Sequence, residues 1–255
     1  MFRYLGEDAD IYYKALPTTW DATSEIGKKR IIGLKETLKK HLPIKGGRAL
    51  DVGCGTGIST FALEELGFKV IGIDIRKEAI QKAKEVAKER CSKAKLEGRK
   101  TIKNLNAFYF MDAKRLEFES ESFDLVDLLG SPLPHFSVYD FDEIIREAYR
   151  VLKPDGVLVI EYADTIKGLY SWHRDAFVEC SLISIHKCFN FIEGLEKRFF
   201  INLNNGTTFS VKFYLWSPWI VEFILRKAGF EVESYYTSER MMVTVGIKTG
   251  SIHKS

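Results

Sequence analysis

Short apolar runs alternate along the first part of the chain with segments in which apolar residues recur every three or four positions. The runs predict strands at 49–52, 69–75, 108–111, 123–129 and 157–162. The periodic segments predict helices at 21–42, up to Leu66, at 77–96 and at 141–152. Some runs are apolar at every position, which is typical of parallel strands covered on both faces. The pattern therefore predicts an α/β fold with a doubly wound sheet.

The alternation breaks near residue 165. The stretch 182–216 is rich in β-forming residues, and Asn205-Gly206 within it is typical of a type I′ hairpin. A helical segment at 218–228 and strand-like runs near 230–237 and 241–248 follow. We expect three parts: an N-terminal helical cap (1–45), an α/β core (46–164 and 217–249) and an antiparallel insertion over the ligand crevice (165–216).

Composition narrows the class of protein. The 255 residues are 45% hydrophobic and carry a net charge of +3, which gives no strong field for nucleic acid or membranes. No apolar run approaches the roughly 18 residues of a membrane span, and the N-terminus lacks a signal-peptide pattern. Four scattered cysteines indicate neither a zinc motif nor a disulfide framework: Cys54, Cys91, Cys180 and Cys188. We expect a cytoplasmic protein with no metal.

A glycine-rich turn, ALDVGCGTG at 49–57, joins a predicted buried strand to a helix. Glycines at 53, 55 and 57 let the backbone approach a ligand closely and turn its N–H groups toward it. The spacing is G-x-G-x-G, because position 58 is Ile. Asp51 before the turn would repel a pyrophosphate but suit an ammonium group. Both features disfavour a nicotinamide dehydrogenase.

Two more acidic residues end predicted strands. Asp74 ends VIGID and Asp112 follows FYFM, so both belong to the same edge of the sheet as the glycine turn. A carboxylate at the first position can accept two hydrogen bonds from a ribose diol, and one at the second can accept from an exocyclic amine. Each acid alone is also consistent with a solvated helix cap. The three acids together favour a nucleoside site.

The motifs LDVGCGTG, VIGID, MDA, FDLVDLLG and LKPDGVLVIE occur in this order, and with them the chain resembles the class I S-adenosylmethionine-dependent methyltransferases over about 46–164 and 217–248. The resemblance implies a Rossmann-like seven-stranded sheet with the last strand antiparallel. It also implies S-adenosyl-L-methionine as methyl donor and S-adenosyl-L-homocysteine as product. The implied cofactor residues are Asp51 at the amino group, Gly53, Cys54, Gly55 and Gly57 at the methionine end, Asp74 at the ribose, Ile75 on the adenine, Asp112 and Ala113 at its N6, and Leu129.

Within this class the chain looks most like glycine N-methyltransferase and its small-molecule relatives. The likeness rests on LLGSPLPHF (128–136), on the antiparallel insertion and on FSVKFYLWSPWIVEFILRKAGF (209–230). Ser131 and Pro132 stand where that enzyme's pattern has Asn-Ser, and Ala163 stands where it has the arginine for the substrate carboxylate. These departures argue against glycine as the acceptor.

Methyl transfer from a sulfonium needs mainly positioning and exclusion of water, with a general base for some acceptors. The predicted catalytic residues are His135, Glu161 and Tyr162, at or after strand ends. His135 either faces the acceptor or braces its loop. His173 and Arg174 in the insertion either bind an acidic substrate or form surface pairs.

Aromatic residues gather before the first helix and at the end of the insertion: Tyr12, Tyr13, Trp20, Phe213, Tyr214, Trp216 and Trp219. They either fill the core or close over a cationic group. We predict transfer to a nitrogen or oxygen atom of a small molecule. Two alternatives stay open. The first is an RNA or protein methyltransferase, which the basic run 88–100 supports. The second is a cofactor-binding protein without turnover. Neither the acceptor nor the oligomeric state follows from the sequence.

Overall fold

A computed structural model describes residues 12–16, 21–96, 107–171 and 173–250. Its central element is a seven-stranded sheet of order β10-β11-β5-β4-β1-β2-β3. Only β11 runs against its neighbours β5 and β10. The strands are β1 (Gly47–Val52), β2 (Phe68–Asp74), β3 (Phe108–Phe110), β4 (Phe123–Leu128), β5 (Leu152–Ala163), β10 (Phe230–Tyr236) and β11 (Met241–Lys248). The predicted Rossmann-like sheet with an antiparallel last strand is confirmed.

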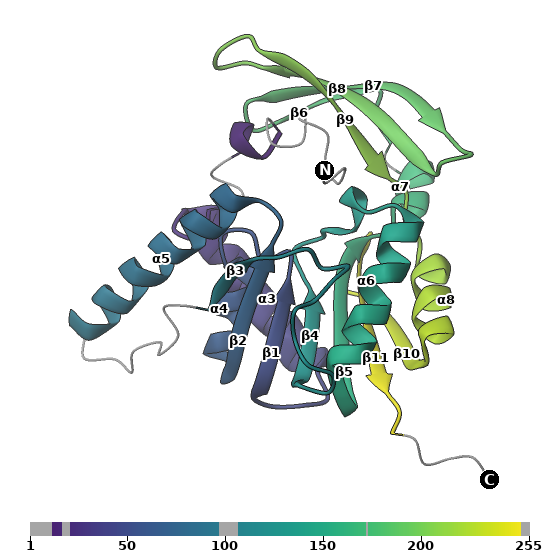
Figure 1. The fold of residues 1–255 in the computed structure, drawn as a ribbon. Helices are drawn as coiled ribbons and strands as arrows, with labels where there is room; N and C mark the ends of the chain where they lie inside the picture. The colour runs from purple at the N-terminus through teal and green to yellow at the C-terminus, as the bar shows by residue number, and fades with distance from the viewer. Residues whose placement is uncertain (1–11, 17–20, 97–106, 172, 251–255) are drawn as a thin grey trace.

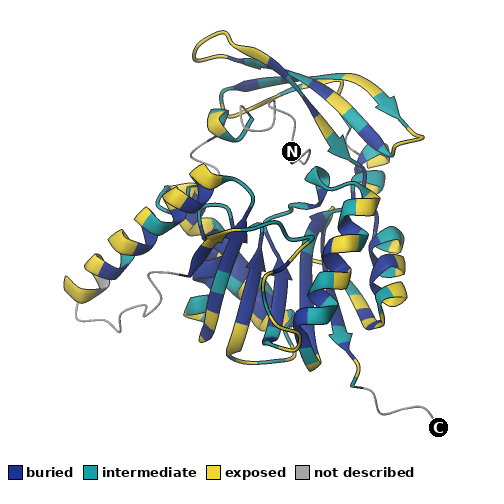
Figure 2. Ribbon diagram, viewed as in Figure 1, coloured by how far each residue is buried: buried dark blue, intermediate teal, exposed yellow. Residues whose placement is uncertain are grey.

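Helices cover both faces of this sheet (Figure 1). Adjacent residues of a strand point to opposite faces, so Ala49 packs in one core cluster and Leu50 in the other. The first cluster involves α3 (Glu25–His41), α4 (Ile58–Glu65) and α5 (Lys77–Leu96), and the second α6 (Val138–Val151) and α8 (Pro218–Ala228). Figure 2 shows the sheet buried between these layers. None of the helices in the described ranges is long and apolar enough to cross a membrane.

A second sheet, here called the lid sheet (176–214), lies above the carboxyl ends of the core strands (Figure 1). After α7 (Thr165–Ser171), its antiparallel strands are β6 (Ala176–Glu179), β7 (Leu182–Asn190), β8 (Leu195–Asn202) and β9 (Thr208–Tyr214). Its apolar face packs Phe200 and Phe209 with Leu16 and Tyr12 of the N-terminal segment. The predicted antiparallel insertion after strand five is thereby confirmed.

The insertion leaves and rejoins the core at one point. The backbone N–H of Thr165 donates to the carbonyl oxygen of Trp216 at 2.9 Å, and the Thr165 hydroxyl donates to the same oxygen at 2.8 Å. Trp216 itself is fully buried in the core cluster of α6 and α8. The two ends of the insertion are therefore held together by the rigid core.

Local details differ from the sequence expectations. The β8–β9 connection spans 203–207, and Gly206 has a φ of +71° whereas Asn205 has no positive φ, so the two-residue type I′ turn was wrong. The Asn205 side chain instead accepts from the Thr207 N–H at 3.0 Å. Strand β5 begins at Leu152, earlier than 157, because its pairing with β4 shifts register there. Helix α7 was not expected.

Candidate functional site

A cavity opens at the carboxyl ends of β1 and β2, beneath the lid sheet. Nine residues proposed from the sequence line it: Gly53, Cys54, Gly55, Asp74, Ile75, Asp112, Ala113, Leu129 and His135. Four others proposed from the sequence do not: Asp51, Gly57, Glu161 and Tyr162. The parallel sheet thus brings most of the proposed site together, and each exception has a physical cause.

Asp74 fixes the glycine turn to the end of β2. One of its carboxylate oxygens accepts from the Gly55 N–H at 2.9 Å, and the other accepts from the Arg76 N–H at 2.8 Å. The Arg76 guanidinium lies 3.5 Å from the second oxygen. Asp74 is only 6% exposed and still lines the cavity. Each oxygen retains a lone pair, so the carboxylate can accept further hydrogen bonds from a ligand.

The N–H groups of the glycine turn donate mostly within the protein. Those of Gly53 and Cys54 donate to the Ile73 carbonyl, and that of Gly57 donates to the Cys54 carbonyl. The expectation that these N–H groups point at a ligand is therefore wrong for these positions. The missing side chains instead leave space beside the backbone, into which a ligand can come close. A Cβ added at Gly53 would lie 3.7 Å from the nearest protein atom, and one added at Gly55 would lie 3.8 Å from it.

Gly57 serves packing. It has a φ of +98°, and a Cβ there would approach the Phe61 ring at 2.8 Å. It is the N-cap of α4 and has no side chain with which to cap it. Glycine is thus required by the left-handed backbone and by the aromatic ring beneath it. This explains why Gly57 shares the motif without lining the cavity.

Asp51 lies below the turn. Its side chain points to the α4 face of the sheet, as that of Ala49 does, and accepts from the Ser59 hydroxyl at 2.7 Å and the Thr60 hydroxyl at 2.5 Å. Asp127 pairs with it in register on β4, and both are fully buried. Burial raises the pKa of Asp51 to about 6 and that of Asp127 well above its usual value. Each carboxyl of the pair therefore keeps its proton to a higher pH than an exposed aspartate does.

We expect Asp127→Asn to flatten the pH dependence of stability between pH 5 and 8. The pKa of Asp127 is higher in the folded than in the unfolded state, so the folded state binds the proton more tightly. The stability that this carboxyl contributes is present at low pH and is lost as pH rises through the folded pKa. Relative to the variant, the wild type should therefore lose unfolding free energy as pH rises, by at most about 1.4 kcal/mol per pH unit for one proton. Urea unfolding at each pH measures it.

Asp124→Asn, on the same strand, is the matched control. Burial opposes ionisation of Asp124, but the hydrogen bond and charge of Lys153 lower its pKa overall. Its contribution is therefore constant above pH 5, and the variant should be destabilised equally at every pH tested. A pH profile of Asp127→Asn that runs parallel to that of the wild type would contradict the raised pKa of Asp127.

His135 lines the cavity together with Tyr13, one of the aromatic residues noted before the first helix, and with Arg76, which the sequence did not single out. Its Nε2 is hydrogen-bonded to the Tyr13 hydroxyl, and the Arg76 guanidinium stacks over the Tyr13 ring at 4.0 Å. Burial, helped by the Arg76 charge, lowers the pKa of His135 to about 4. The imidazole is therefore neutral at physiological pH. Its Nδ1 is buried and makes no hydrogen bond within the described structure.

The loop that carries His135 is braced from three sides. The Trp216 indole N–H donates to the Leu133 carbonyl at 2.7 Å, within the 3-10 turn Leu133–His135. The Glu161 carboxylate accepts from the Gly130 N–H at 3.0 Å. Ser131 is held at a φ of +61°, which is unusual for a residue with a side chain. The loop is thus fixed before any ligand arrives.

Tyr162 points away from the cavity. It lies on the same face of β5 as Leu158 and Ile160, inside the α6 and α8 core cluster. Its hydroxyl is hydrogen-bonded to the Thr244 hydroxyl at 3.0 Å, and burial raises its pKa to about 12. The structure therefore does not bring Tyr162 to the site, and the expectation of a catalytic role is corrected to a packing role.

Arg30 lines the cavity although no local pattern marks it, and Tyr13 lines it as a member of the aromatic group before the first helix. Both come from segments N-terminal to the first strand, and only tertiary packing brings them to the site. Arg76 had a signal, since it follows Asp74 by two residues at a strand end. Of the other aromatic residues, Trp219 is 71% exposed and Trp20 lies outside the described residues.

Comparison with known proteins identifies the domain. A family profile described as "Methyltransferase domain" matches residues 44–187, more than half of the chain. The chain belongs to the methyltransferase domain family. By fold and family this methyltransferase is of class I, the class whose methyl donor is S-adenosylmethionine. The closer likeness to glycine N-methyltransferase stays a prediction.

Two curated relatives illustrate the similarity. This methyltransferase is 30% identical over 135 residues to the cypemycin N-terminal methyltransferase of a Streptomyces species, covering 52% of this chain and 48% of that protein. It is 32% identical over 143 residues to the 27-O-demethylrifamycin SV methyltransferase of Amycolatopsis mediterranei (strain S699), covering 55% and 48%. The chain spans about half the length of these relatives. Among solved structures, the PH0226 protein of Pyrococcus horikoshii OT3 is 26% identical with a TM-score of 0.70, covering 94% of this chain and 99% of that one.

The cavity of this methyltransferase fits its cofactor chemically. The open sides of Gly53 and Gly55 leave room for a ligand chain, and two strand-end carboxylates, Asp74 and Asp112, face the same space. One Asp112 oxygen accepts from the Lys114 N–H at 2.9 Å, which orients the group. His135, whose Nδ1 is buried without a hydrogen-bond partner in the described structure, lines the same space. The residues present match a ligand with hydroxyl, amine and apolar parts.

Proposed function

We propose that this methyltransferase moves the methyl group of S-adenosylmethionine to a nitrogen or oxygen atom of a small molecule. The observation that carries the proposal is the single cavity wall formed by the glycine turn, Asp74 and Asp112, with His135 and Tyr13 beneath the lid sheet. The printed names of the two curated relatives, one an N-terminal and one a 27-O methyltransferase, support a nitrogen or oxygen target.

The residues of this wall are assigned to different parts of the cofactor. We assign Asp74 to the ribose hydroxyls, Ile75 and Leu129 to the faces of the adenine, and Asp112 with Ala113 to its amino edge. Gly53, Cys54 and Gly55 would hold the methionine end. Asp51 acts indirectly, because its bonds to Ser59 and Thr60 fix the start of α4 beneath the turn. When bound, the cofactor supplies a methyl group on a sulfonium with a neutral leaving group.

The chain's own contribution to the transfer is orientation and exclusion of water. With Nε2 engaged by Tyr13, the His135 imidazole is held at the wall of the cavity, and we assign this ring to the methyl acceptor. A histidine with a pKa of about 4 is a weak base, so it suits accepting a hydrogen bond from an acceptor that arrives uncharged. Glu161 positions the loop through Gly130 and does not touch the cavity.

We also propose the division of the chain expected from its sequence. Residues 1–45 would form a helical cap, 46–164 and 217–249 the cofactor-binding core, and 165–216 the cover of the acceptor site. The contacts of Tyr12 with Phe200 (ring centroids 5.3 Å apart) and Phe213 (5.7 Å) support the last assignment, because the next residue, Tyr13, lines the cavity.

His135→Ala is expected to lower methyl transfer about 100-fold while the S-adenosylmethionine dissociation constant changes less than about threefold. The reason is that the imidazole is assigned to the acceptor and not to the cofactor. Label transfer from the cofactor to a metabolite extract measures the rate, and calorimetry measures binding. His41→Ala, on the far end of α3, is the control. Unchanged transfer in His135→Ala would contradict the assignment.

The extract assay also separates the alternatives. Label in the small-molecule fraction supports the proposal, and label only in RNA or protein fractions replaces it with a macromolecular acceptor. Cofactor binding with no transfer to any fraction would favour a binding protein without turnover. Salt dependence distinguishes specific RNA transfer from non-specific attraction to the basic run 88–100, part of which lies outside the described residues.

A further inference from the structure

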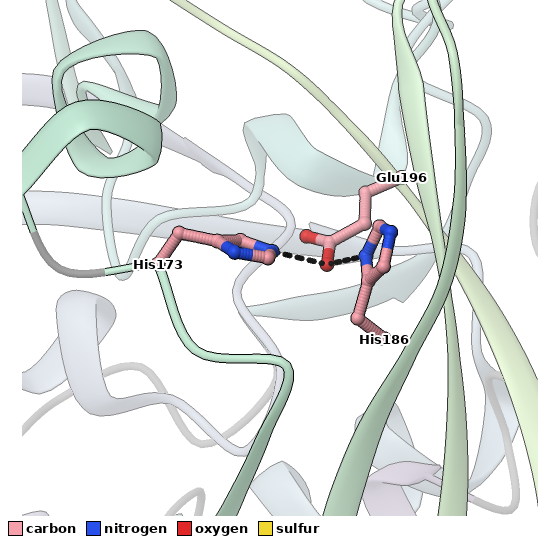
Figure 3. A group of neighbouring side chains, drawn as sticks. All are labelled: His173, His186 and Glu196. Carbon is pink, nitrogen blue, oxygen red and sulfur yellow. Dashed lines mark hydrogen bonds and ion pairs between the residues drawn. The ribbon is translucent and has the colours of Figure 1, made fainter.

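The lid sheet contains a group of potential metal ligands that the cofactor site does not use. In the described part of the chain, His173, His186 and Glu196 are the one group of three such residues whose ligand atoms all lie within 4.8 Å of one another (Figure 3). His173 follows α7, His186 lies on β7 and Glu196 lies on β8. Because three separate segments supply them, no sequence spacing marks the group.

Both imidazoles face one carboxylate oxygen. Nδ1 of His186 lies 2.8 Å and Nε2 of His173 lies 3.5 Å from Oε1 of Glu196 (Figure 3). Ligands about 2.0–2.1 Å from a tetrahedral ion are roughly 3.3 Å apart, so these separations are close to those of a loaded site. A divalent ion can take the place between the three atoms with small side-chain movements.

The ligands are held in place by packing. The His186 ring lies 4.4 Å and the His173 ring 5.4 Å from the Phe189 ring, centroid to centroid. The three ligand side chains are 12–21% exposed, so the group is shielded but reachable from solvent. Nε2 of His173 is buried and makes no hydrogen bond within the described structure. This nitrogen therefore has a lone pair or proton without a well-placed partner.

Arg198 orients the carboxylate. Its guanidinium contacts Oε1 of Glu196 at 2.5 Å and is itself anchored on the Ser184 hydroxyl at 2.7 Å and the Arg174 carbonyl at 3.1 Å. Hydrogen bonds of this kind hold a ligating carboxylate in a fixed orientation toward the metal ion. The positive charge of Arg198 on the same oxygen lowers the affinity for a cation, so Arg198 and the ion would share the carboxylate.

We propose that His173, His186 and Glu196 bind a divalent transition-metal ion, with Zn²⁺ the best match. Two imidazole nitrogens and one carboxylate oxygen are a zinc ligand set, and water can fill the fourth tetrahedral position. The hard ions Mg²⁺ and Ca²⁺ prefer oxygen ligands and fit poorly. The ion would join the segment after α7 to two strands of the lid sheet. The proposal is independent of the acceptor.

Calorimetric titration of Zn²⁺ into EDTA-treated, dialysed full-length protein tests the site. One ion per chain should bind with a micromolar or lower dissociation constant. His173→Ala and Glu196→Gln should each weaken binding about 100-fold or more, and His41→Ala should leave it unchanged. Co²⁺ should give the intense visible absorption of a tetrahedral ion in the wild type and in His41→Ala, and not in the two site variants. Absence of binding at 100 micromolar Zn²⁺, or equal binding by the two site variants, would overturn the proposal.

A thermal readout guards against misfolded variants. Saturating Zn²⁺ should raise the melting temperature of the wild type and of His41→Ala but not that of His173→Ala, while all three melt cooperatively in EDTA. His173→Cys, which keeps a zinc ligand at this position, should restore part of the shift. A zinc-dependent shift in His173→Ala as large as that in the wild type would contradict the assignment of this ligand.

Discussion

Replacement of Asp74 by alanine is expected to weaken S-adenosylmethionine binding about 100-fold or more. A hydrogen bond to a charged group contributes about 1.5–3 kcal/mol, and the variant loses the two assigned to the ribose. The variant also loses the 2.9 Å hydrogen bond that the Gly55 N–H donates to the Asp74 carboxylate, so the glycine turn is no longer held to the end of β2. Titration calorimetry with S-adenosylmethionine and S-adenosylhomocysteine measures the loss.

The control for this prediction is a carboxylate that the cavity does not use. Glu231→Ala, on the exposed side of β10, should bind both ligands as the wild type does. NADH should bind neither protein. Wild-type affinity in Asp74→Ala would refute the ribose assignment, and a preference of the wild type for NADH would overturn the identification of the cofactor site.

Trp216→Ala should lower the free energy of unfolding by about 3–5 kcal/mol, the usual cost of removing a fully buried large aromatic side chain. Trp216 is completely buried, and its ring packs on that of Phe141 with centroids 4.8 Å apart. Its indole N–H also donates to the Leu133 carbonyl in the turn before His135. The variant should therefore lose stability and also loosen the acceptor end of the cavity. Urea unfolding measures the first effect.

Trp219 provides a close comparison, three residues along the chain. It is 71% exposed, so Trp219→Ala should change the unfolding free energy by less than about 0.5 kcal/mol. Equal destabilisation by the two substitutions would show that the core described around Trp216 is wrong. Hydrogen exchange at residues 130–136 should increase in Trp216→Ala and stay unchanged in Trp219→Ala.

The core of the fold follows from local signals. The bounds predicted for α5 and α8, Lys77–Leu96 and Pro218–Ala228, are those observed, because periodic apolar positions end at clear breaks. The number of strands in the sheet and the antiparallel direction of the last one came from the resemblance to a family, and the strand order came from the structure. The register shift that starts β5 at Leu152 and the five-residue β8–β9 connection depend on strand pairing, which no local pattern specifies.

The sequence predicted those residues of the candidate site whose position follows from lying at the end of a parallel strand. Asp74 and Asp112 reach the cavity because strand ends meet at one edge. Tyr162 was misjudged because its face of β5 depends on which strand residues pack against α6 and α8. Tyr13 and Arg30 arrive from distant segments, so their presence in the cavity is a consequence of tertiary packing alone.

The closed base of the insertion, where Thr165 is bonded to the carbonyl of Trp216, has an evolutionary consequence. The proposed cover of the acceptor site, residues 165–216, is one continuous stretch of sequence whose ends are hydrogen-bonded to each other. Such a stretch can be exchanged by a single recombination event without cutting any strand of the cofactor-binding sheet. New acceptor preferences can therefore arise by grafting a segment onto an unchanged scaffold, and a chimera that swaps residues 166–215 reproduces that step in the laboratory.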